Sequence, residues 1–134
     1  MYYRRIAMTN YSVCPFCNLS EDRIIDEGRH FVVIRDGYPI TLAHTLVIPK
    51  RHVGSIFELE EEERETLFSV LEAAKERLVD EFHPDSFNIG INDGPEAGQT
   101  VPHLHIHLIP RYKGDVEDPR GGVRWIMPDM ARYW

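Results

Sequence analysis

The spacing of apolar residues predicts one long helix over residues 60–82. Apolar side chains recur there three or four positions apart, as on one face of a helix, at Leu67, Leu71, Ala74 and Leu78. His83-Pro84 ends the helix. The acidic run 60–63 suits the positive end of the helix dipole, and we interpret it as a solvent-exposed helix start.

Four other segments are rich in apolar and β-branched residues and are bounded by turn residues, which is typical of strands. They span residues 30–35, 41–48, 86–92 and 101–110, and Pro49 is expected to end the second. Phe87, Ile89 and Ile91 alternate with polar residues and predict one apolar face. Strands grouped around one helix, without repeated βαβ units, predict an α+β fold with an antiparallel sheet.

Length and composition limit the classes of protein. The 134 residues contain no repeat or internal linker, so we expect a single domain over 1–134. We find no apolar run of the ~20 residues that a membrane span needs, and no apolar stretch behind the basic N-terminus that would indicate a signal peptide. Fifteen Lys and Arg against 22 Asp and Glu give a net charge of −7, which argues against a nucleic-acid partner.

The cysteines and the C-terminal tail add two observations. Cys14 and Cys17 are too few and too close for the disulfide framework of a secreted domain, so we expect a cytoplasmic protein in which this pair binds metal or is redox-active. The tail, residues 113–134, has no clear periodicity, but its three aromatic side chains indicate that it packs on something.

Three histidines alternate with apolar residues in the segment predicted as the last strand. Side chains at i, i+2 and i+4 of a strand share a face, so His103, His105 and His107 are expected on one side, with their apolar neighbours in the core. The outer two would lie ~13 Å apart, too far to reach one metal ion together. At least one imidazole is therefore left for nucleophilic, acid–base or anion-binding chemistry.

The loop before these histidines, Asn92 to Thr100, contains two glycines whose backbone amides could cradle an anion. It matches neither the P-loop nor the dinucleotide-binding pattern. An imidazole beside such a cradle is suited to nucleophilic phosphoryl or nucleotidyl transfer, because that chemistry depends on positioning and charge stabilisation.

The motif His103-Leu-His-Ile-His-Leu-Ile109 resembles the signature of the histidine triad (HIT) family of nucleotide hydrolases and transferases. The resemblance extends from about Cys14 to Tyr112 and includes the segment Ala43 to His52. It implies a sheet of about five antiparallel strands with one long helix packed on it. It also implies a homodimer.

The resemblance implies roles for individual residues. His105 would be the nucleophile that forms a nucleotidyl–histidine intermediate, with His107 at the phosphate and His44 behind it. The residues that would contact nucleotide besides His105 and His107 are Asp36 at the ribose, Asn92, Gly98, Gln99, Thr100 and Val101 at the phosphate, and Ile25 and Ile34 at the base. Core packing would explain the two isoleucines equally well.

The cysteines fit a zinc-containing variant of the family. The ligands of a closed, structural zinc site would be Cys14, Cys17, His52 and His103. A redox role for the Cys-Pro-Phe-Cys sequence would need a βαβ context, which the pattern does not indicate.

The resemblance implies an enzyme that cleaves a nucleoside 5′-phosphate derivative and releases a nucleoside monophosphate. The sequence from Asn92 to Val101 is most similar to the fragile-histidine-triad branch, which favours a purine dinucleoside polyphosphate as substrate. The alternatives are a purine nucleoside phosphoramidate hydrolase, a phosphorylase-type transferase, a catalytically silent nucleotide-binding regulatory module and a zinc-binding interaction domain.

Overall fold

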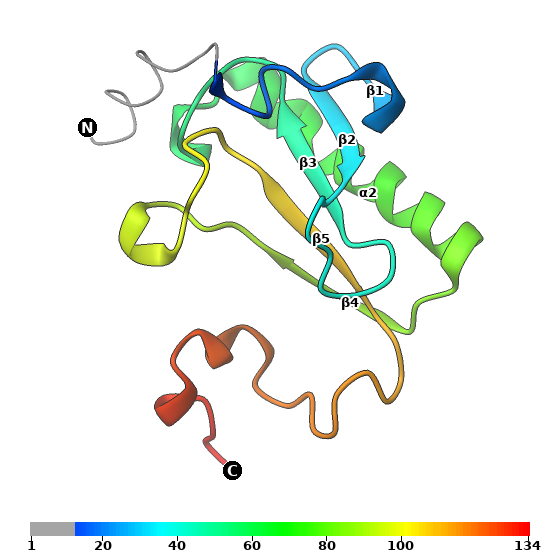
Figure 1. Cartoon of the computed structure of the whole chain (residues 1–134), viewed down its shortest axis with the longest axis vertical. Helices are drawn as coiled ribbons and strands as arrows, with labels where there is room; N and C mark the ends of the chain where they lie inside the picture. Colours follow the sequence, from blue (N-terminus) through cyan, green and yellow to red (C-terminus); the bar gives the residue numbers. More distant parts are fainter. Residues whose placement is uncertain (1–12) are drawn as a thin grey trace.

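The computed structural model describes residues 13–134, and the expectation about a signal peptide concerns residues before this range. The described chain forms a sheet with a long helix on one side (Figure 1). The elements are β1 (Ile24–Glu27), β2 (Phe31–Arg35), β3 (Thr45–Pro49), α2 (Glu61–Phe82), β4 (Ser86–Gly90) and β5 (Ile106–Arg111). Neighbouring strands pair antiparallel in the order β1-β2-β3-β5-β4. The predicted α+β fold, with five strands and a long helix, is confirmed.

Each face of the sheet buries its own apolar cluster. Helix α2 packs over β2, β3 and β5, and its four predicted core residues join a cluster with Val47, Ile106 and Leu108. On the opposite face, Ile34 and Leu46 are covered by Phe16 and other residues that precede β1. Because both faces are covered, β2 and β3 read as continuous apolar runs without alternation.

The start of α2 differs from its predicted role. Glu60 is the N-cap, and Glu63 completes a capping box with it, accepting from the Glu60 backbone N–H at 2.7 Å. Glu63 is only 4% exposed and binds Arg51, so the acidic run is not a purely solvent-exposed helix start. No helix within residues 13–134 combines the length and the apolar character that a membrane crossing requires.

The second predicted strand began too early. Ala43 has a φ of 66°, and the His44 N–H donates to the Thr41 carbonyl, so residues 41–44 form a turn and β3 begins at Thr45. Pro49, opposite Phe31, is the last residue of β3, so the predicted end of this strand is confirmed to within one residue. The turn brings His44 back toward β5.

The last predicted strand also began too early, because β5 starts at Ile106. A strand continuing through Leu104 would need ladder partners at the end of β3, but Pro49 has no N–H to donate. Its carbonyl accepts instead from the His103 ring, and the Leu104 N–H donates to Val53. The predicted burial of Leu104, Ile106 and Leu108 is confirmed, since each is 1% exposed.

Strand β4 is shorter than predicted and lies at an edge of the sheet. It ends at Gly90, not Asn92, and Phe87 and Ile91 pack on the core as expected. Ile89 is 58% exposed, so the predicted apolar face is only partly buried. The reason is that the helix is centred over β2, β3 and β5 and leaves part of the edge strand uncovered.

The tail forms two short 3₁₀ helices, η5 (Gly122–Ile126) and η6 (Pro128–Met130). In Figure 1 the tail, coloured orange to red, runs beside β4. Its arginines lie over its own aromatic rings, with Arg120 above Trp134 and Arg124 above Tyr133. The aromatic residues therefore pack partly within the tail itself.

Candidate functional site

Four cysteine and histidine side chains converge from three parts of the chain, and we call them the metal cluster: Cys14, Cys17, His52 and His103. A tight turn, with the Cys17 N–H bonded to the Cys14 carbonyl, points both sulfurs the same way. His52 follows β3, and His103 precedes β5. One donor atom from each residue lies within 4.8 Å of the others.

The donor atoms suit a tetrahedral zinc ion. His103 Nδ1 lies 3.4 Å from Cys14 Sγ, 3.5 Å from Cys17 Sγ and 3.1 Å from His52 Nδ1. Zn²⁺ bound to nitrogen and thiolate requires ligand atoms about 3.3–3.8 Å apart, so the measured separations are of the right size or somewhat shorter. His103 Nε2 donates to the Pro49 carbonyl at 2.8 Å, which leaves Nδ1 as the lone-pair nitrogen facing the sulfurs.

The protonation state of His103 in the metal cluster is the one that metal binding requires. Burial lowers the pKa of His103 to about 4, so its imidazole is neutral near pH 7. Desolvation and the neighbouring Cys14 raise the pKa of the Cys17 thiol to about 12. A bound cation would lower the pKa of the Cys17 thiol, because a sulfur that coordinates a metal is deprotonated.

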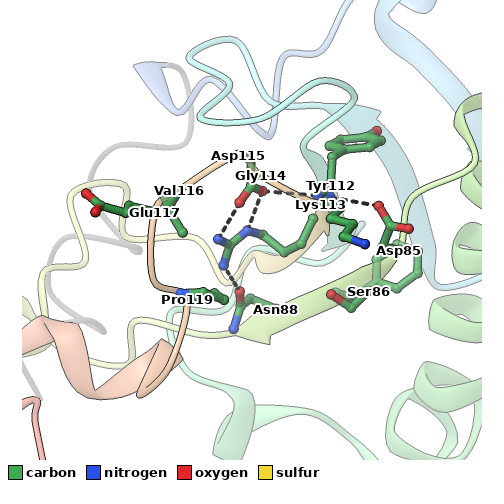
Figure 2. Close-up of a pocket in the computed structure, with 12 residues that line it drawn as sticks. Asp85, Ser86, Asn88, Tyr112, Lys113, Gly114, Asp115, Val116, Glu117 and Pro119 are labelled. Atoms are coloured by element: carbon green, nitrogen blue, oxygen red, sulfur yellow. Dashed lines mark hydrogen bonds and ion pairs between the residues drawn. The ribbon is translucent and has the colours of Figure 1, made fainter.

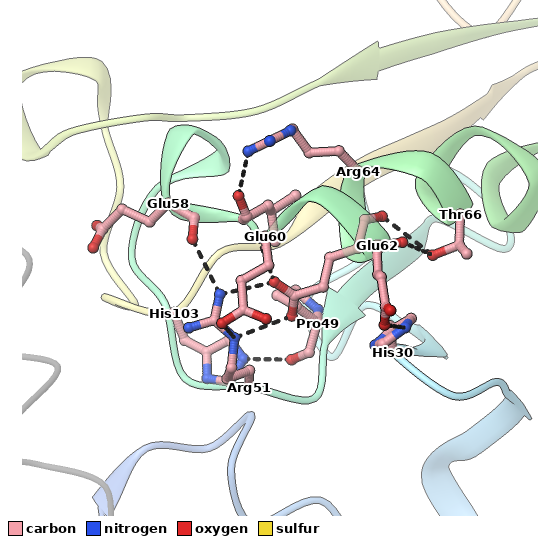
Figure 3. A network of polar contacts seen from close by, with 11 residues as sticks. His30, Pro49, Arg51, Glu58, Glu60, Glu62, Arg64, Thr66 and His103 are labelled. Atoms are coloured by element: carbon pink, nitrogen blue, oxygen red, sulfur yellow. Dashed lines mark hydrogen bonds and ion pairs between the residues drawn. The ribbon is translucent and has the colours of Figure 1, made fainter.

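A partly buried ion pair supports the loop that carries His52. Arg51 donates to both carboxylate oxygens of Glu63, at 2.8 and 3.2 Å, and to the Glu58 carbonyl (Figure 3). Burial alone would raise the pKa of Glu63, but the bonds from Arg51 and from the Glu60 backbone lower it below its ordinary value. The start of α2 is thereby attached to the residue next to a metal-cluster histidine.

His105 lies next to the metal cluster and has a defined proton position. Its Nδ1 lies 2.8 Å from the His103 carbonyl, which can only accept, so Nδ1 carries the proton. The Nε2 lone pair is therefore available as a nucleophile. The Phe16 ring packs against the His105 ring with centroids 5.0 Å apart, and it also contacts His103.

His107, His44 and Asp36 form a second group, which we call the histidine relay. The Ile40 backbone N–H donates to His44 Nδ1 at 3.2 Å, which makes Nε2 the protonated nitrogen of His44. His44 Nε2 lies 2.9 Å from His107 Nδ1 and 3.4 Å from Asp36 Oδ2. His107 Nδ1 consequently accepts, and the His107 proton lies on Nε2.

Both relay histidines are neutral near pH 7. Burial lowers the pKa of His44, an effect that the Asp36 carboxylate partly opposes. Burial, followed by the neighbouring His105 and His44 rings, lowers the pKa of His107 to about 4. The His105 and His107 rings are neighbours, with centroids 5.2 Å apart. A nucleophilic imidazole thus lies beside an imidazole that presents an N–H.

Asp36 makes one contact that is typical of a turn residue, as its sequence suggests, and others that the sequence did not predict. Its Oδ1 accepts from the Tyr38 N–H at 2.8 Å, as in a turn. Its Oδ2 faces the relay, 3.4 Å from His44 and 3.9 Å from His107. The carboxylate follows β2 and lies close to both relay histidines, where it can hold His44.

The loop predicted as an anion cradle folds around the short helix η4 (Pro95–Ala97), with Gly98 at a φ of 95°. Gln99 braces this loop from inside: its Oε1 accepts from Gly94, and its Nε2 donates to the carbonyls of Gly54 and Val101. Its side chain therefore holds the loop, and does not point outward as a phosphate donor. Asn92, Gly98 and Thr100 are exposed, and Val101 is half-buried.

The two isoleucines predicted at the base have different environments. Ile34 is 0% exposed within the cluster beneath Phe16, so the structure favours core packing for this residue. Ile25 is half-buried in β1. Sequence reasoning missed Phe16, the Arg51–Glu63 pair and the Ile40 amide, although the position of Phe16 between the two cysteines was a usable signal.

Comparisons with known proteins agree with this arrangement. A family profile described as the HIT domain matches residues 19–114. The chain is 37% identical over 107 residues to "Protein hit" of Bacillus subtilis, covering 76% of this chain and 74% of that protein. It is 42% identical over 80 residues to the asymmetrical bis(5′-nucleosyl)-tetraphosphatase of Schizosaccharomyces pombe, covering 60% of this chain and 44% of that protein.

The solved structures include a zinc-bound histidine triad protein from Mycobacterium smegmatis. It is 35% identical, with a TM-score of 0.69, and the match covers 78% of this chain and 79% of that chain. The matched profile spans β1 to β5, and with them the histidines of the relay and the metal cluster that follow Leu19. This chain belongs to the HIT domain family.

Proposed function

We propose that this protein hydrolyses a purine dinucleoside polyphosphate through a covalent nucleotidyl–histidine intermediate and releases a nucleoside monophosphate. One observation carries the proposal: His105 presents a lone pair at Nε2 next to the Nε2–H of His107. A nucleophile and a hydrogen-bond donor for the departing oxygen thus lie on adjacent rings.

In the first step, His105 Nε2 attacks the phosphorus of one nucleotidyl group. The P–Nε2 bond forms as the bond to the bridging oxygen breaks, and the rest of the substrate leaves as a nucleoside polyphosphate anion. The phosphorylated His105 ring carries a positive charge while Nδ1 keeps its proton on the His103 carbonyl. The His107 N–H stabilises the charge that develops on the leaving oxygen.

In the second step, water attacks the same phosphorus. The P–Nε2 bond breaks and its electron pair returns to His105, the water proton passes to solvent, and the nucleoside monophosphate leaves. The relay keeps His107 Nδ1 occupied by the His44 proton, so that His107 presents its N–H in both steps.

The electrostatics of the relay favour a polyphosphate over a phosphoramidate. A pKa of about 4 makes His107 a neutral hydrogen-bond donor at pH 7 and not a reservoir of a dissociable proton. A polyphosphate can leave as an anion, whereas an amine leaving group must take up a proton. The similarity to a bis(5′-nucleosyl)-tetraphosphatase supports the same choice.

The remaining site residues bind substrate in this proposal. Asp36 holds a ribose hydroxyl in addition to the relay, and Ile25 contacts the base. The phosphates lie on the loop whose predicted contacts are Asn92, Gly98, Thr100 and Val101, while Gln99 keeps that loop in shape.

The metal cluster holds a structural zinc ion in this proposal. Zinc with four protein ligands has no open position, so it supplies cross-linking and takes no part in the phosphorus chemistry. The cross-link joins the Cys14–Cys17 turn to the ends of β3 and β5.

We further propose a homodimer, in which the edge strand β4 is part of the interface. The exposure of Ile89, at 58%, supports this assignment. Light scattering after size exclusion tests it, and a monomer at micromolar concentration would contradict it.

The covalent step is tested by acid-labile labelling with diadenosine polyphosphate radiolabelled at the α-phosphate. We expect a labelled adduct that maps to His105 and is absent from His105→Ala, which retains AMP affinity within about tenfold while turnover falls more than about a thousandfold. Nucleotide binding without any turnover by the wild-type protein would support the regulatory module instead.

A further inference from the structure

A cavity of about 690 Å³ lies between the histidine face of the sheet and the C-terminal tail. Its walls are Ile40 from the loop after β2, Gly90 and Ile109 from β4 and β5, and Trp125 and Ile126 from η5. The volume is within the range of about 300–1,000 Å³ that is typical of small-molecule sites.

The cavity begins where the histidine relay ends. Gly90 pairs with His107 in the β4–β5 ladder, and Ile109 is two residues beyond His107 on the same face of β5. Ile40 lines the cavity and also donates its backbone N–H to His44. The relay histidines do not line the cavity, but residues directly beside His107 and His44 do, so the cavity adjoins the relay.

The order of the proposed catalytic residues at the start of β5 also places the leaving group near this cavity. His105, His107 and Ile109 follow one another along the chain, so the leaving group on the His107 side of the phosphorus is directed toward Ile109 and the tail. We infer that this cavity is a subsite for the departing nucleoside of a dinucleoside polyphosphate, with Trp125 as the stacking surface for its base. The inference rests on the proposed function.

The charge of the lining suits a neutral nucleoside better than another phosphate. Arg111 is the basic residue of this lining, and its guanidinium is bonded to both oxygens of Asp115 at 2.8 Å and to Asn88. Asp118 is likewise paired, with Arg120 at 2.9 Å. The apolar walls provide contact area for a nucleobase, and the indole ring of Trp125 provides a surface on which the base can stack.

The start of the tail is fixed, so that Trp125 has a defined place. Arg111 and Asp115 close the turn after β5, where Figure 2 shows Asp115 and Asn88 directed at the same guanidinium group from either side. The Lys113 N–H donates to Asp85, and Trp125 Nε1 donates to the Arg120 carbonyl at 2.9 Å. The indole ring thus stays at the cavity without a bound ligand.

The test compares two substrates that transfer the same adenylyl group. Diadenosine triphosphate has a leaving group that carries a nucleoside, whereas the leaving group of adenosine 5′-phosphoramidate is ammonia. We expect Trp125→Ala to lower the ratio of kcat/KM for the first over the second substrate about tenfold, through the KM for diadenosine triphosphate. Met130→Ala, in the same tail but 67% exposed and outside the cavity lining, should leave the ratio unchanged.

A second variant alters the cavity from the sheet, so that its effect does not depend on the conformation of the tail. A Cβ at Gly90 meets no atom within 4 Å, so Gly90→Leu fills the cavity from the sheet without a backbone clash. It should lower the same ratio. If both cavity variants leave the ratio of kcat/KM values unchanged, the subsite is overturned. It is also overturned if Trp125→Ala changes the oligomeric state but not this ratio. In that case a second copy of the chain covers the cavity.

If wild-type protein turns over neither substrate, the proposed function fails and the cavity is tested by binding alone. Adenosine should then quench tryptophan fluorescence, and Gly90→Leu should abolish the quenching. Absence of quenching in the wild-type protein would overturn the subsite independently of catalysis.

Discussion

The main-chain carbonyl of His103 accepts the Nδ1 proton of His105 at 2.8 Å, while the His103 ring faces the two cysteines. One residue thus contributes its side chain to the metal cluster and its backbone carbonyl to the proposed nucleophile, His105. The position of that carbonyl, and with it the proton and ring orientation of His105, depends on how firmly the His103 ring is held.

Cys14→Ser therefore tests both roles of the metal cluster. We expect the variant to lose zinc and about 2 kcal/mol or more of unfolding free energy, because a structural site contributes to folding. We also expect kcat to fall at 20 °C, where the variant is still folded, more than KM changes. Zinc content by mass spectrometry, urea titration and steady-state kinetics provide the measurements. An unchanged zinc stoichiometry would refute the ligand set.

Phe16→Ala tests the contact between the cysteine turn and the nucleophile. The Phe16 ring lies against His105 at 5.0 Å, and its loss should lower kcat about tenfold by leaving the imidazole less restrained. Leu19→Ala is the matched control, because Leu19 packs on the same apolar cluster. If the two variants lower kcat equally, at similar losses of stability, Phe16 acts only as a core residue and does not position His105.

The sequence predicted the main elements well because their patterns are local. The helix over residues 60–82 and the inward positions of Leu104, Ile106 and Leu108 follow from periodicity, and the structure confirms both. The metal cluster could be anticipated only through the family resemblance, since its members come from three distant parts of the chain.

The predictions that were wrong depend on tertiary partners that no local pattern records. Residues 41–44 have an apolar composition compatible with a strand, but a left-handed Ala43 turns the chain so that His44 meets His107. Glu63 is indistinguishable from its acidic neighbours until Arg51 lies beside it. A contact that was not predicted has the same origin, since Gln99 bonds the Gly54 carbonyl across the fold, while its contact with nucleotide stays a prediction.

The low pKa of His107 predicts a pH-dependent stability. A group with a folded pKa of about 4 and an unfolded value of 6.5 binds more protons when unfolded between these pH values. Its contribution is therefore fully present above pH 6.5 and is lost progressively as the pH falls toward 4. His107→Gln removes that dependence, so the difference in unfolding free energy between pH 7 and pH 5 should shrink by up to about 2 kcal/mol.

Urea titrations of wild type and His107→Gln at both pH values provide the measurement. Histidines that do not contact His107 titrate in both proteins and cancel in the comparison, whereas His44 and His105 contact it, so the measured difference belongs to His107 together with these two neighbours. An identical pH dependence of the two proteins would mean that the pKa of His107 is the same in the folded and unfolded states, which would remove the low pKa on which its role as a neutral donor rests.

Glu63→Gln tests whether the start of α2 supports the metal cluster. The amide can still accept from Arg51, but it loses the charge that strengthens a two-point contact to a guanidinium. Because Arg51 precedes His52, we expect weaker zinc binding, by about tenfold in competition with a chromogenic chelator. Glu62→Gln is the control, since Glu62 is the neighbouring residue on the helix and its side chain is 69% exposed. If both variants hold zinc equally well, the ion pair only caps the helix, and the His52 loop keeps its shape without it.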